Sequence, residues 1–191
     1  MIRDRSLIYH LTDLENLASI LQHGLKPRCE LSNDEFNDIA DGEILYSRAN
    51  HSLDNFVPFH FFAKNPFDYG VQRTHPDKDF LLVTVHRNFA RISGFRIVPT
   101  HPLAEEGYQI LDYDAGFSAI DWELMEERDY DDRACKVVCM AECLSPKAVP
   151  PHFFFSIYVK DERVEKIVNA MVLKYNASCR VNINSKMFVG E

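Results

Sequence analysis

Short hydrophobic runs bounded by polar or turn residues recur along the chain, and they predict β-strands. The predicted strands are Leu7–His10, Ile44–Ser47, Phe80–His86, Cys135–Leu144, Phe153–Val159 and Arg180–Asn184. In the fourth run, period two would place Cys135, Cys139 and Cys143 on one face and Glu142 on the other. A carboxylate inside an apolar strand needs a partner or a function, unless it lies at an exposed strand end.

A second pattern, with apolar side chains at i, i+3, i+4 and i+7, begins at Leu14 and predicts an amphipathic helix. Thr12 and Glu15 have the spacing of a capping box at its start. Gly24 and Pro27 supply the expected end, because glycine suits the residue after a helix and proline prevents its continuation. The strand before it and this helix start predict a corner between Tyr9 and Thr12.

Two more helices are predicted, an acidic one over Phe117–Glu127 and a strongly periodic one over Asp161–Tyr175. Strands and helices are mixed without regular strand–helix–strand alternation. This order predicts an α+β fold rather than a doubly wound parallel sheet. No repeat or low-complexity linker is visible, so we expect a single domain over residues 1–191.

Composition excludes several classes of protein. Hydrophobic residues make up 46% of the 191 residues and charged residues 26%, which is typical of a globular chain. No apolar run is long enough to span a membrane, and no apolar signal-peptide core follows Met1–Ser6, so we expect a cytoplasmic protein. The five cysteines are an odd number without paired CxxC units, which favours buried thiols over disulfides or a metal site.

The formal net charge of −8 argues against tracking along duplex nucleic acid, but it leaves room for a short single strand. The charge is unevenly distributed. Phe80–Ala104 contains Arg87, Arg91 and Arg96 but no acid, and it is one candidate source of positive field, or simply a solvated face. Glu105–Asp132 is strongly acidic and is either a solvated face or a surface that a partner protein recognises.

Three places carry residues suited to binding or catalysis. His10, beside free backbone donors at a strand end, could meet ribose hydroxyls or a phosphate, or could be a packed histidine. Arg48 could hold a pyrophosphate by a bidentate contact, or could be a surface charge. Tyr69, just beyond an aromatic block, could stack on a planar ring. The familiar nucleotide, metalloprotease and hydrolase motifs are absent from the sequence.

Four segments in order along the chain form a more specific combination: Ile8–Leu17 (IYHLTDLENL), Asp54–Phe61 (DNFVPFHF) with Asn65–Tyr69 (NPFDY), Ile120–Met125 (IDWELM) and Ala141–Leu144 (AECL). This combination resembles the DarT family of DNA ADP-ribosyltransferase toxins, whose segments read close to YHIT…NL, VPFYF…SPMLY, VDWEVM and AEFL. The catalytic glutamate of the last segment corresponds to Glu142. The tyrosine of the family's VPFYF segment is His60 here.

The resemblance implies an ADP-ribosyltransferase fold, with a split, mostly antiparallel β core, flanking helices and NAD in a cleft. It implies transfer of ADP-ribose from NAD to a base of single-stranded DNA, by the toxin of a toxin–antitoxin pair whose antitoxin is a macrodomain. Glu142 and Arg48 are then the expected catalytic residues, Glu142 as the carboxylate and Arg48 to hold NAD and assist removal of the proton from the acceptor base, and no metal is expected. The residues expected to contact NAD are His10, Leu11, Thr12, Ser19, Arg48 and Tyr69.

Two alternatives keep part of this interpretation. The chain could be an ADP-ribosyltransferase that modifies RNA or a protein, or a non-catalytic relative that only binds a nucleotide. In the first case the NAD chemistry is the same, because cleavage of the nicotinamide bond develops positive charge that a carboxylate stabilises. Only the acceptor would differ.

Overall fold

The computed structural model describes residues 1–32, 36–39, 42–102 and 108–190. Within these ranges, eight strands form one sheet in the order β5-β4-β6-β2-β1-β3-β7-β8. Every neighbouring pair is antiparallel except β7 and β8, which are parallel. The strands are β1 (Leu7–Asp13), β2 (Val57–His60), β3 (Phe80–His86), β4 (Arg96–Val98), β5 (Leu111–Asp112), β6 (Glu142–Ser145), β7 (Ser156–Val159) and β8 (Arg180–Ile183).

The sheet is split in the middle. β1 pairs with β3 from Leu7 to Asp13, and β2 pairs with β6 from Val57 to His60. Between β1 and β2, however, the register contains the single pair Tyr9–His60. The two halves therefore separate on leaving this pair, which is the split β core that the resemblance implies.

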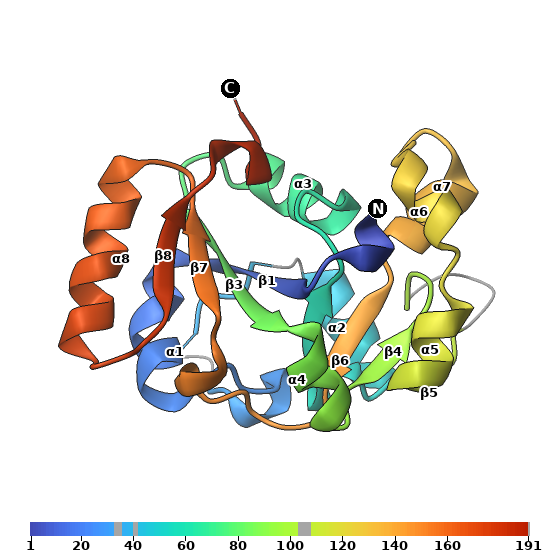
Figure 1. Cartoon of the computed structure of the whole chain (residues 1–191), viewed down its shortest axis with the longest axis horizontal. Helices are drawn as coiled ribbons and strands as arrows, with labels where there is room; N and C mark the ends of the chain where they lie inside the picture. The colour runs from blue at the N-terminus through green and yellow to red at the C-terminus, as the bar shows by residue number, and fades with distance from the viewer. Residues whose placement is uncertain (33–35, 40–41, 103–107, 191) are drawn as a thin grey trace.

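Five of the helices in the described ranges lie near the two ends of the sheet. Figure 1 shows α8 and α1 at the β8 end, and α5, α6 and α7 near the β4 and β5 end. The helices are α1 (Leu17–His23), α2 (Gly42–Asn50), α3 (Pro66–Thr74), α4 (Arg87–Ile92), α5 (Tyr113–Ala119), α6 (Trp122–Glu127), α7 (Arg133–Cys139) and α8 (Glu162–Lys174). None of the helices in the described ranges is both long and apolar enough to cross a membrane.

Two of the predicted strands are helical. Ile44–Ser47 lies inside α2, and Cys135–Cys139 lies inside α7, so only Glu142–Leu144 of the fourth predicted strand belongs to a strand, β6. The Asp132 carboxylate begins α7 by accepting a hydrogen bond from the Cys135 backbone N–H at 2.6 Å. A spacing of four residues fits both a strand face and a helix face, and here it places the Cys135 and Cys139 sulfurs 4.0 Å apart on a helix.

The first helix also begins later than predicted. Thr12 is part of β1, and Asp13 rather than Thr12 accepts the capping bond, from the Glu15 N–H at 3.0 Å. A short 3₁₀ helix, Leu14–Asn16, leads into α1. The predicted end at Gly24 is confirmed, with φ of 84°. A Cβ there would lie 2.6 Å from the Val149 carbonyl oxygen, so only glycine allows this close approach.

The predicted acidic helix over Phe117–Glu127 is two helices, α5 and α6. The chain becomes extended at Ile120, and the Asp121 carboxylate then caps α6 by accepting a hydrogen bond from the Leu124 N–H at 3.0 Å. Trp122 and Met125 turn inward to the core. Local capping therefore overrides the continuous apolar pattern in this segment.

The cysteines differ in exposure. Cys29 is exposed, whereas Cys135, Cys139, Cys143 and Cys179 are buried, and all five are free thiols. Burial raises the pKa of Cys139 to about 12 and also raises the pKa values of Cys143 and Cys179. The buried sulfurs act as small apolar core groups, as the composition predicts.

Candidate active site

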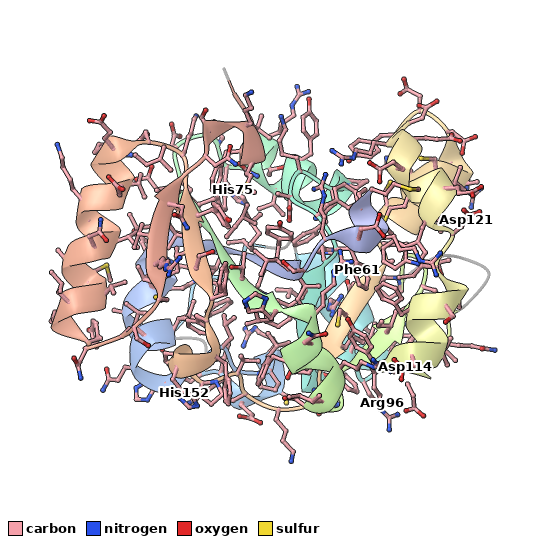
Figure 2. All side chains as sticks on the ribbon, viewed as in Figure 1. Phe61, His75, Arg96, Asp114, Asp121 and His152 are labelled. Atoms are coloured by element: carbon pink, nitrogen blue, oxygen red, sulfur yellow. The ribbon has the colours of Figure 1, made fainter. Side chains whose placement is uncertain are left out.

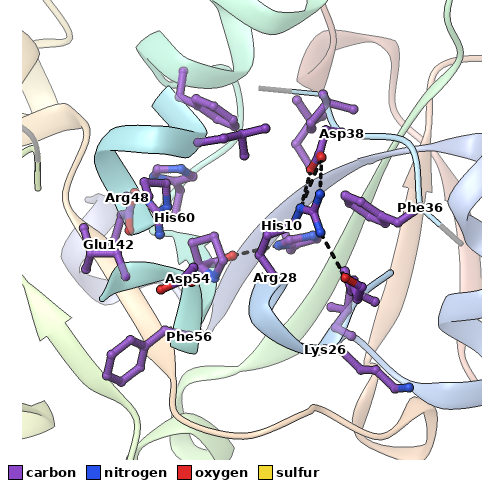
Figure 3. Close-up of a pocket in the computed structure, with 18 of the residues that line it drawn as sticks. His10, Lys26, Arg28, Phe36, Asp38, Arg48, Asp54, Phe56, His60 and Glu142 are labelled. Carbon is purple, nitrogen blue, oxygen red and sulfur yellow. Dashed lines mark hydrogen bonds and ion pairs between the residues drawn. The ribbon is translucent and has the colours of Figure 1, made fainter. Parts of the chain in front are cut away.

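A cleft opens where the two halves of the sheet part (Figure 3). Its walls come from elements that are distant in sequence. β1 supplies His10, β2 supplies Pro58 and His60, β6 supplies Glu142, and α2 supplies Arg48. The split thus collects a carboxylate, a guanidinium and imidazoles in one place.

His10 bridges the split. Its Nδ1 lies 2.7 Å from the Pro58 carbonyl oxygen. Because a carbonyl only accepts hydrogen bonds, Nδ1 must carry the proton, which leaves Nε2 of the neutral ring as an acceptor. Burial lowers the pKa of His10 to about 4, despite the opposing effect of the Pro58 bond. The ring is therefore neutral near pH 7.

Glu142 and Arg48 form a buried ion pair. Arg48 Nη1 donates to Glu142 Oε1 at 2.8 Å, and the two side chains are only 14% and 7% exposed. Arg48 Nη2 and Glu142 Oε2 are buried without a hydrogen-bond partner in the described part of the chain. Unpaired buried polar atoms are costly, so two of them facing one cleft point to a polar ligand that completes the pair.

The predicted local setting of these two residues was wrong, although the structure brings them together. Arg48 lies in the last turn of α2 rather than after a strand. Glu142 is the first residue of β6, directly after the turn that ends α7. The last turn of α2 and the first residue of β6 therefore meet at one ion pair.

The other residues predicted to contact NAD divide into two groups. Leu11 and Ser19 line the cleft together with His10 and Arg48. Thr12 is buried and its hydroxyl accepts a bond from Asn16, so it lies behind the cleft wall. Tyr69 lies outside the cleft on α3, where it is 39% exposed. The Tyr69 ring therefore does not line the cleft in which it was predicted to stack on a ligand.

Sequence reasoning missed a second polar group at the far side of the cleft. Arg28 donates to both oxygens of Asp38, with its Nη2 2.7 Å from Oδ2. The Arg28 guanidinium also lies 6.0 Å from the centre of the Phe36 ring. Figure 3 shows this group across the cleft from Glu142. No local pattern singles out these residues, because the ion pair joins Arg28, at the start of a short 3₁₀ helix (Arg28–Glu30), to Asp38 ten residues further on.

The acid-free stretch is not a basic surface. Arg87 is buried, and its guanidinium donates to the backbone carbonyls of Leu7, Arg3 and Phe61. Arg91 is exposed but paired with Asp114 at 2.7 Å. Arg96 remains exposed near this pair (Figure 2). The idea that Arg87 supplies positive field to a nucleic acid is therefore wrong.

Among the residues that the structure describes, no group of three His, Cys, Asp or Glu side chains is arranged to hold a metal ion. The polar groups of the cleft instead suit a ligand that carries a hydroxyl group, an anionic part and a cationic part. Neutral His10 offers a lone pair, Arg48 offers donors, and Glu142 offers a negative oxygen.

Solved structures with the same fold identify its class. The DarT of Thermus sp. 2.9 in complex with ADP-ribosylated ssDNA matches with a TM-score of 0.85 and 20% identity, covering 96% of each chain. The same Thermus protein in complex with NAD+ matches with a TM-score of 0.81 and 19% identity, over 97% of this chain and 98% of that one. The split sheet is therefore the fold of an ADP-ribosyltransferase.

The family follows from the sequence match. The family described as "ssDNA thymidine ADP-ribosyltransferase, DarT" matches residues 9–189, so the chain belongs to the DarT family. A Thermosipho africanus protein described as a DNA ADP-ribosyl transferase–DNA ADP-ribosyl glycohydrolase fusion is 28% identical over 172 residues. That match covers 82% of this chain and 43% of the fusion protein.

Proposed function

We propose that this chain transfers the ADP-ribose of NAD to a thymine base of single-stranded DNA and releases nicotinamide. Family membership supports the reaction class and the acceptor. The observation that carries the proposal is the Arg48–Glu142 pair, in which each partner keeps one buried atom unpaired toward the cleft. A structural ion pair would have both partners satisfied.

Glu142 supplies the electrostatic part of the mechanism. Breaking the bond between ribose and nicotinamide develops positive charge on the ribose. The negative Oε2 oxygen of Glu142 is free to face that charge, while Oε1 stays fixed by Arg48. An oxygen that is already in place needs no reorganisation during the reaction, which is the main source of such stabilisation.

Arg48 and His10 bind and orient the dinucleotide. Arg48 Nη2 can donate to an anionic or hydroxyl oxygen of NAD, which would satisfy its buried N–H groups. His10 Nε2 can accept a bond from a ribose hydroxyl, because its Nδ1 proton is held by Pro58. Leu11 and Ser19 line the same cleft, which supports the role predicted for them.

The acceptor strand should be short and unpaired. A net charge of −8 opposes an extended phosphate footprint. A base inside a duplex would also have to be unstacked, at a cost of about a few kcal/mol, before its ring nitrogen could enter the cleft. We therefore expect modification of single strands, held more by base contacts than by phosphate neutralisation.

A toxin role extends the proposal. The Thermosipho relative joins a transferase to a DNA ADP-ribosyl glycohydrolase, which would reverse the modification. The present chain would then act with a macrodomain antitoxin as a partner, in the cytoplasm expected from the sequence. The exposed acidic segment of α5 and α6, where Asp114 and Asp121 lie (Figure 2), remains a candidate surface for that partner.

The direct test is incubation of the chain with NAD and matched acceptors, followed by mass measurement of the products. A thymine-containing single-stranded oligonucleotide should gain one ADP-ribose, and the same strand annealed to its complement should react far more slowly. Transfer to RNA or to protein instead of DNA would assign a different acceptor. Binding of NAD without nicotinamide release or transfer would identify a non-catalytic relative.

A further inference from the structure

His60 is the neighbour of the cleft carboxylate Glu142 on strand β2. It lies directly opposite Glu142 in the register of β2 and β6. Opposed residues of antiparallel strands place their side chains on the same face, with Cβ atoms about 5 Å apart. His60 is only 6% exposed, and both side chains line the cleft, beside Arg48 (Figure 3).

The His60 ring is held in one tautomer and one orientation. Its Nδ1 lies 3.3 Å from the Ala141 carbonyl oxygen, which can only accept, so Nδ1 carries the proton. The ring also stacks on Phe67, with centroids 5.7 Å apart and planes at 29°. Nε2, at the opposite edge of the ring, has no hydrogen-bond partner in the ranges the structure describes, so its lone pair is available.

The surroundings keep this lone pair unprotonated. Burial lowers the pKa of His60, and the positive charge of Arg48 and the nearby His101 lower it further. Glu142 and the Ala141 bond act in the opposite direction but are outweighed. His10, across the split, is the remaining titratable neighbour and is itself neutral. His60 is thus a neutral imidazole beside the carboxylate that is paired with Arg48.

We propose, given the function proposed above, that His60 Nε2 is the base that receives the proton of the attacking ring nitrogen of the acceptor base. The N–H bond of the acceptor breaks, and the proton moves to Nε2. The electron pair left on that nitrogen forms the bond to the ribose carbon that carried nicotinamide. The bond to nicotinamide breaks, its electron pair returns to the pyridinium nitrogen, and neutral nicotinamide leaves. His60 then releases its proton to solvent.

The other polar groups of the cleft are less suited to this step. Arg48 is a guanidinium that stays protonated in proteins, so it has no lone pair to offer. Glu142 already balances Arg48, and its free oxygen is required by the developing cation. His10 lies on β1 across the split, bound to the Pro58 carbonyl, and unlike His60 it is not opposite Glu142 in the strand register. In this mechanism Glu142 stabilises the developing positive charge, and His60 accepts the proton.

The test compares wild type with His60→Asn and His60→Gln in single-turnover transfer from NAD to a thymine-containing single strand, over about pH 5 to 9. Asparagine can still donate to the Ala141 carbonyl, and both variants lack a titrating base. We expect about 10²-fold or greater loss of transfer near pH 7.5 with unchanged NAD affinity. The wild-type rate should fall at low pH with an apparent pKa below 6.5, and this fall should be absent in both variants.

His152→Gln is the matched control, because this exposed histidine lies away from the cleft (Figure 2) and should leave rate and pH profile unchanged. Near-wild-type transfer by both His60 variants, or a retained acid limb in either, would overturn the proposal. Loss of NAD binding in step with transfer would assign His60 a structural role and also overturn it. A wild-type chain that releases nicotinamide but modifies no DNA would instead refute the proposed function, and this inference with it.

Discussion

Two arginines with little solvent exposure, Arg87 and Arg48, have opposite surroundings. Arg87 donates to three backbone carbonyls, and its guanidinium lies within 5.2 Å of the Phe61 ring centre and 5.6 Å of the Trp122 ring centre. Within the described part of the chain, Arg48 donates to Glu142, and its Nη2 is buried without a hydrogen-bond partner. The guanidinium of Arg87 is hydrogen-bonded within the fold, whereas the buried Nη2 of Arg48 would need a ligand to accept its hydrogen bond.

This difference separates a structural charge from a functional one. Arg87 connects Arg3 of the N-terminal 3₁₀ helix (Ile2–Asp4) and Leu7 of β1 to Phe61, the residue after β2. Its charge therefore stabilises the packing of backbone segments. Arg48 and Glu142 leave polar atoms in excess, which destabilises the free protein and favours a bound one. The exposure of Arg87 and Arg48 would not distinguish their roles. The presence of an unpaired buried donor on Arg48 does.

The largest effect on folding is expected from Arg87→Met. The substitution keeps the apolar stem but leaves the carbonyls of Leu7, Arg3 and Phe61 without their donor. The free energy of unfolding should fall by about 3–5 kcal/mol. Urea denaturation measures it, and Arg91→Met, which removes an exposed pair with Asp114, is the control that should change little. A loss no larger than that of the control would break the comparison.

Glu142→Gln should affect activity strongly and stability little, the reverse of Arg87→Met. The substitution removes the negative charge from the cleft, while glutamine keeps an oxygen for Arg48. Transfer of ADP-ribose should drop by about 10² to 10³, equivalent to about 2.7–4 kcal/mol of transition-state stabilisation. The free energy of unfolding should change by less than about 1 kcal/mol. Single-turnover kinetics and urea denaturation on one preparation give both values. Turnover close to wild type would contradict the role of this carboxylate.

Asp68 sharpens the comparison, because it also has a buried unpaired oxygen but lies outside the cleft wall. Its Oδ2 accepts from the Lys64 N–H at 3.1 Å, while the N-cap Asn65 accepts from the Asp68 N–H. Burial raises the pKa of Asp68 to about 7. The folded protein therefore keeps this carboxyl neutral where the unfolded chain has lost the proton.

The sign of the resulting pH effect follows from linkage. Between the ordinary value of 3.8 and about 7 the folded state binds the extra proton, so the contribution of Asp68 to stability is full below this window and is lost as pH rises through it. Asp68→Asn should remove that loss. Between pH 4 and pH 8, the free energy of unfolding of the variant should therefore gain about 1–3 kcal/mol relative to that of the wild type. Urea denaturation at the two pH values checks it, and an equal pH slope in both proteins would refute it.

Tyr69→Ala should have the smallest effect. The ring is exposed and interacts with Arg73, whose guanidinium lies 5.6 Å from its centre, so neither the cleft nor the core depends on it. We expect NAD affinity within about twofold of wild type and a stability change within about 0.5 kcal/mol. Isothermal calorimetry with NAD measures the first quantity. A large loss of affinity would restore the stacking role predicted from the sequence.

The sequence predicted best where one physical demand dominates. β3 is Phe80–His86 as predicted, because a run buried on both faces has few alternatives in a sheet. The last helix, predicted over Asp161–Tyr175, has Asp161 as its N-cap and runs from Glu162 to Lys174. Cys135–Cys139 failed because a four-residue spacing satisfies both periods, and the capping Asp132 was the signal that favoured a helix.

The candidate site was predictable only in part. His10, Arg48 and Glu142 do meet in one cleft, but the resemblance to a family, not local spacing, linked residues 94 positions apart. His60 appeared in the sequence only as a departure from the family's tyrosine. Its position opposite Glu142 depends on the register of β2 with β6, which a hydrophobic pattern does not specify across so long a connection.

The unequal exposure of the five thiols has a practical consequence. Four sulfurs are shielded in the core, and burial holds three of them as thiols by raising the pKa. Maleimides and similar reagents attack thiolates that solvent can reach, so the native chain should take up one label, at Cys29. This position follows Arg28 of the cleft wall. A fluorophore attached there would report ligand entry in the wild-type sequence, without any engineered cysteine.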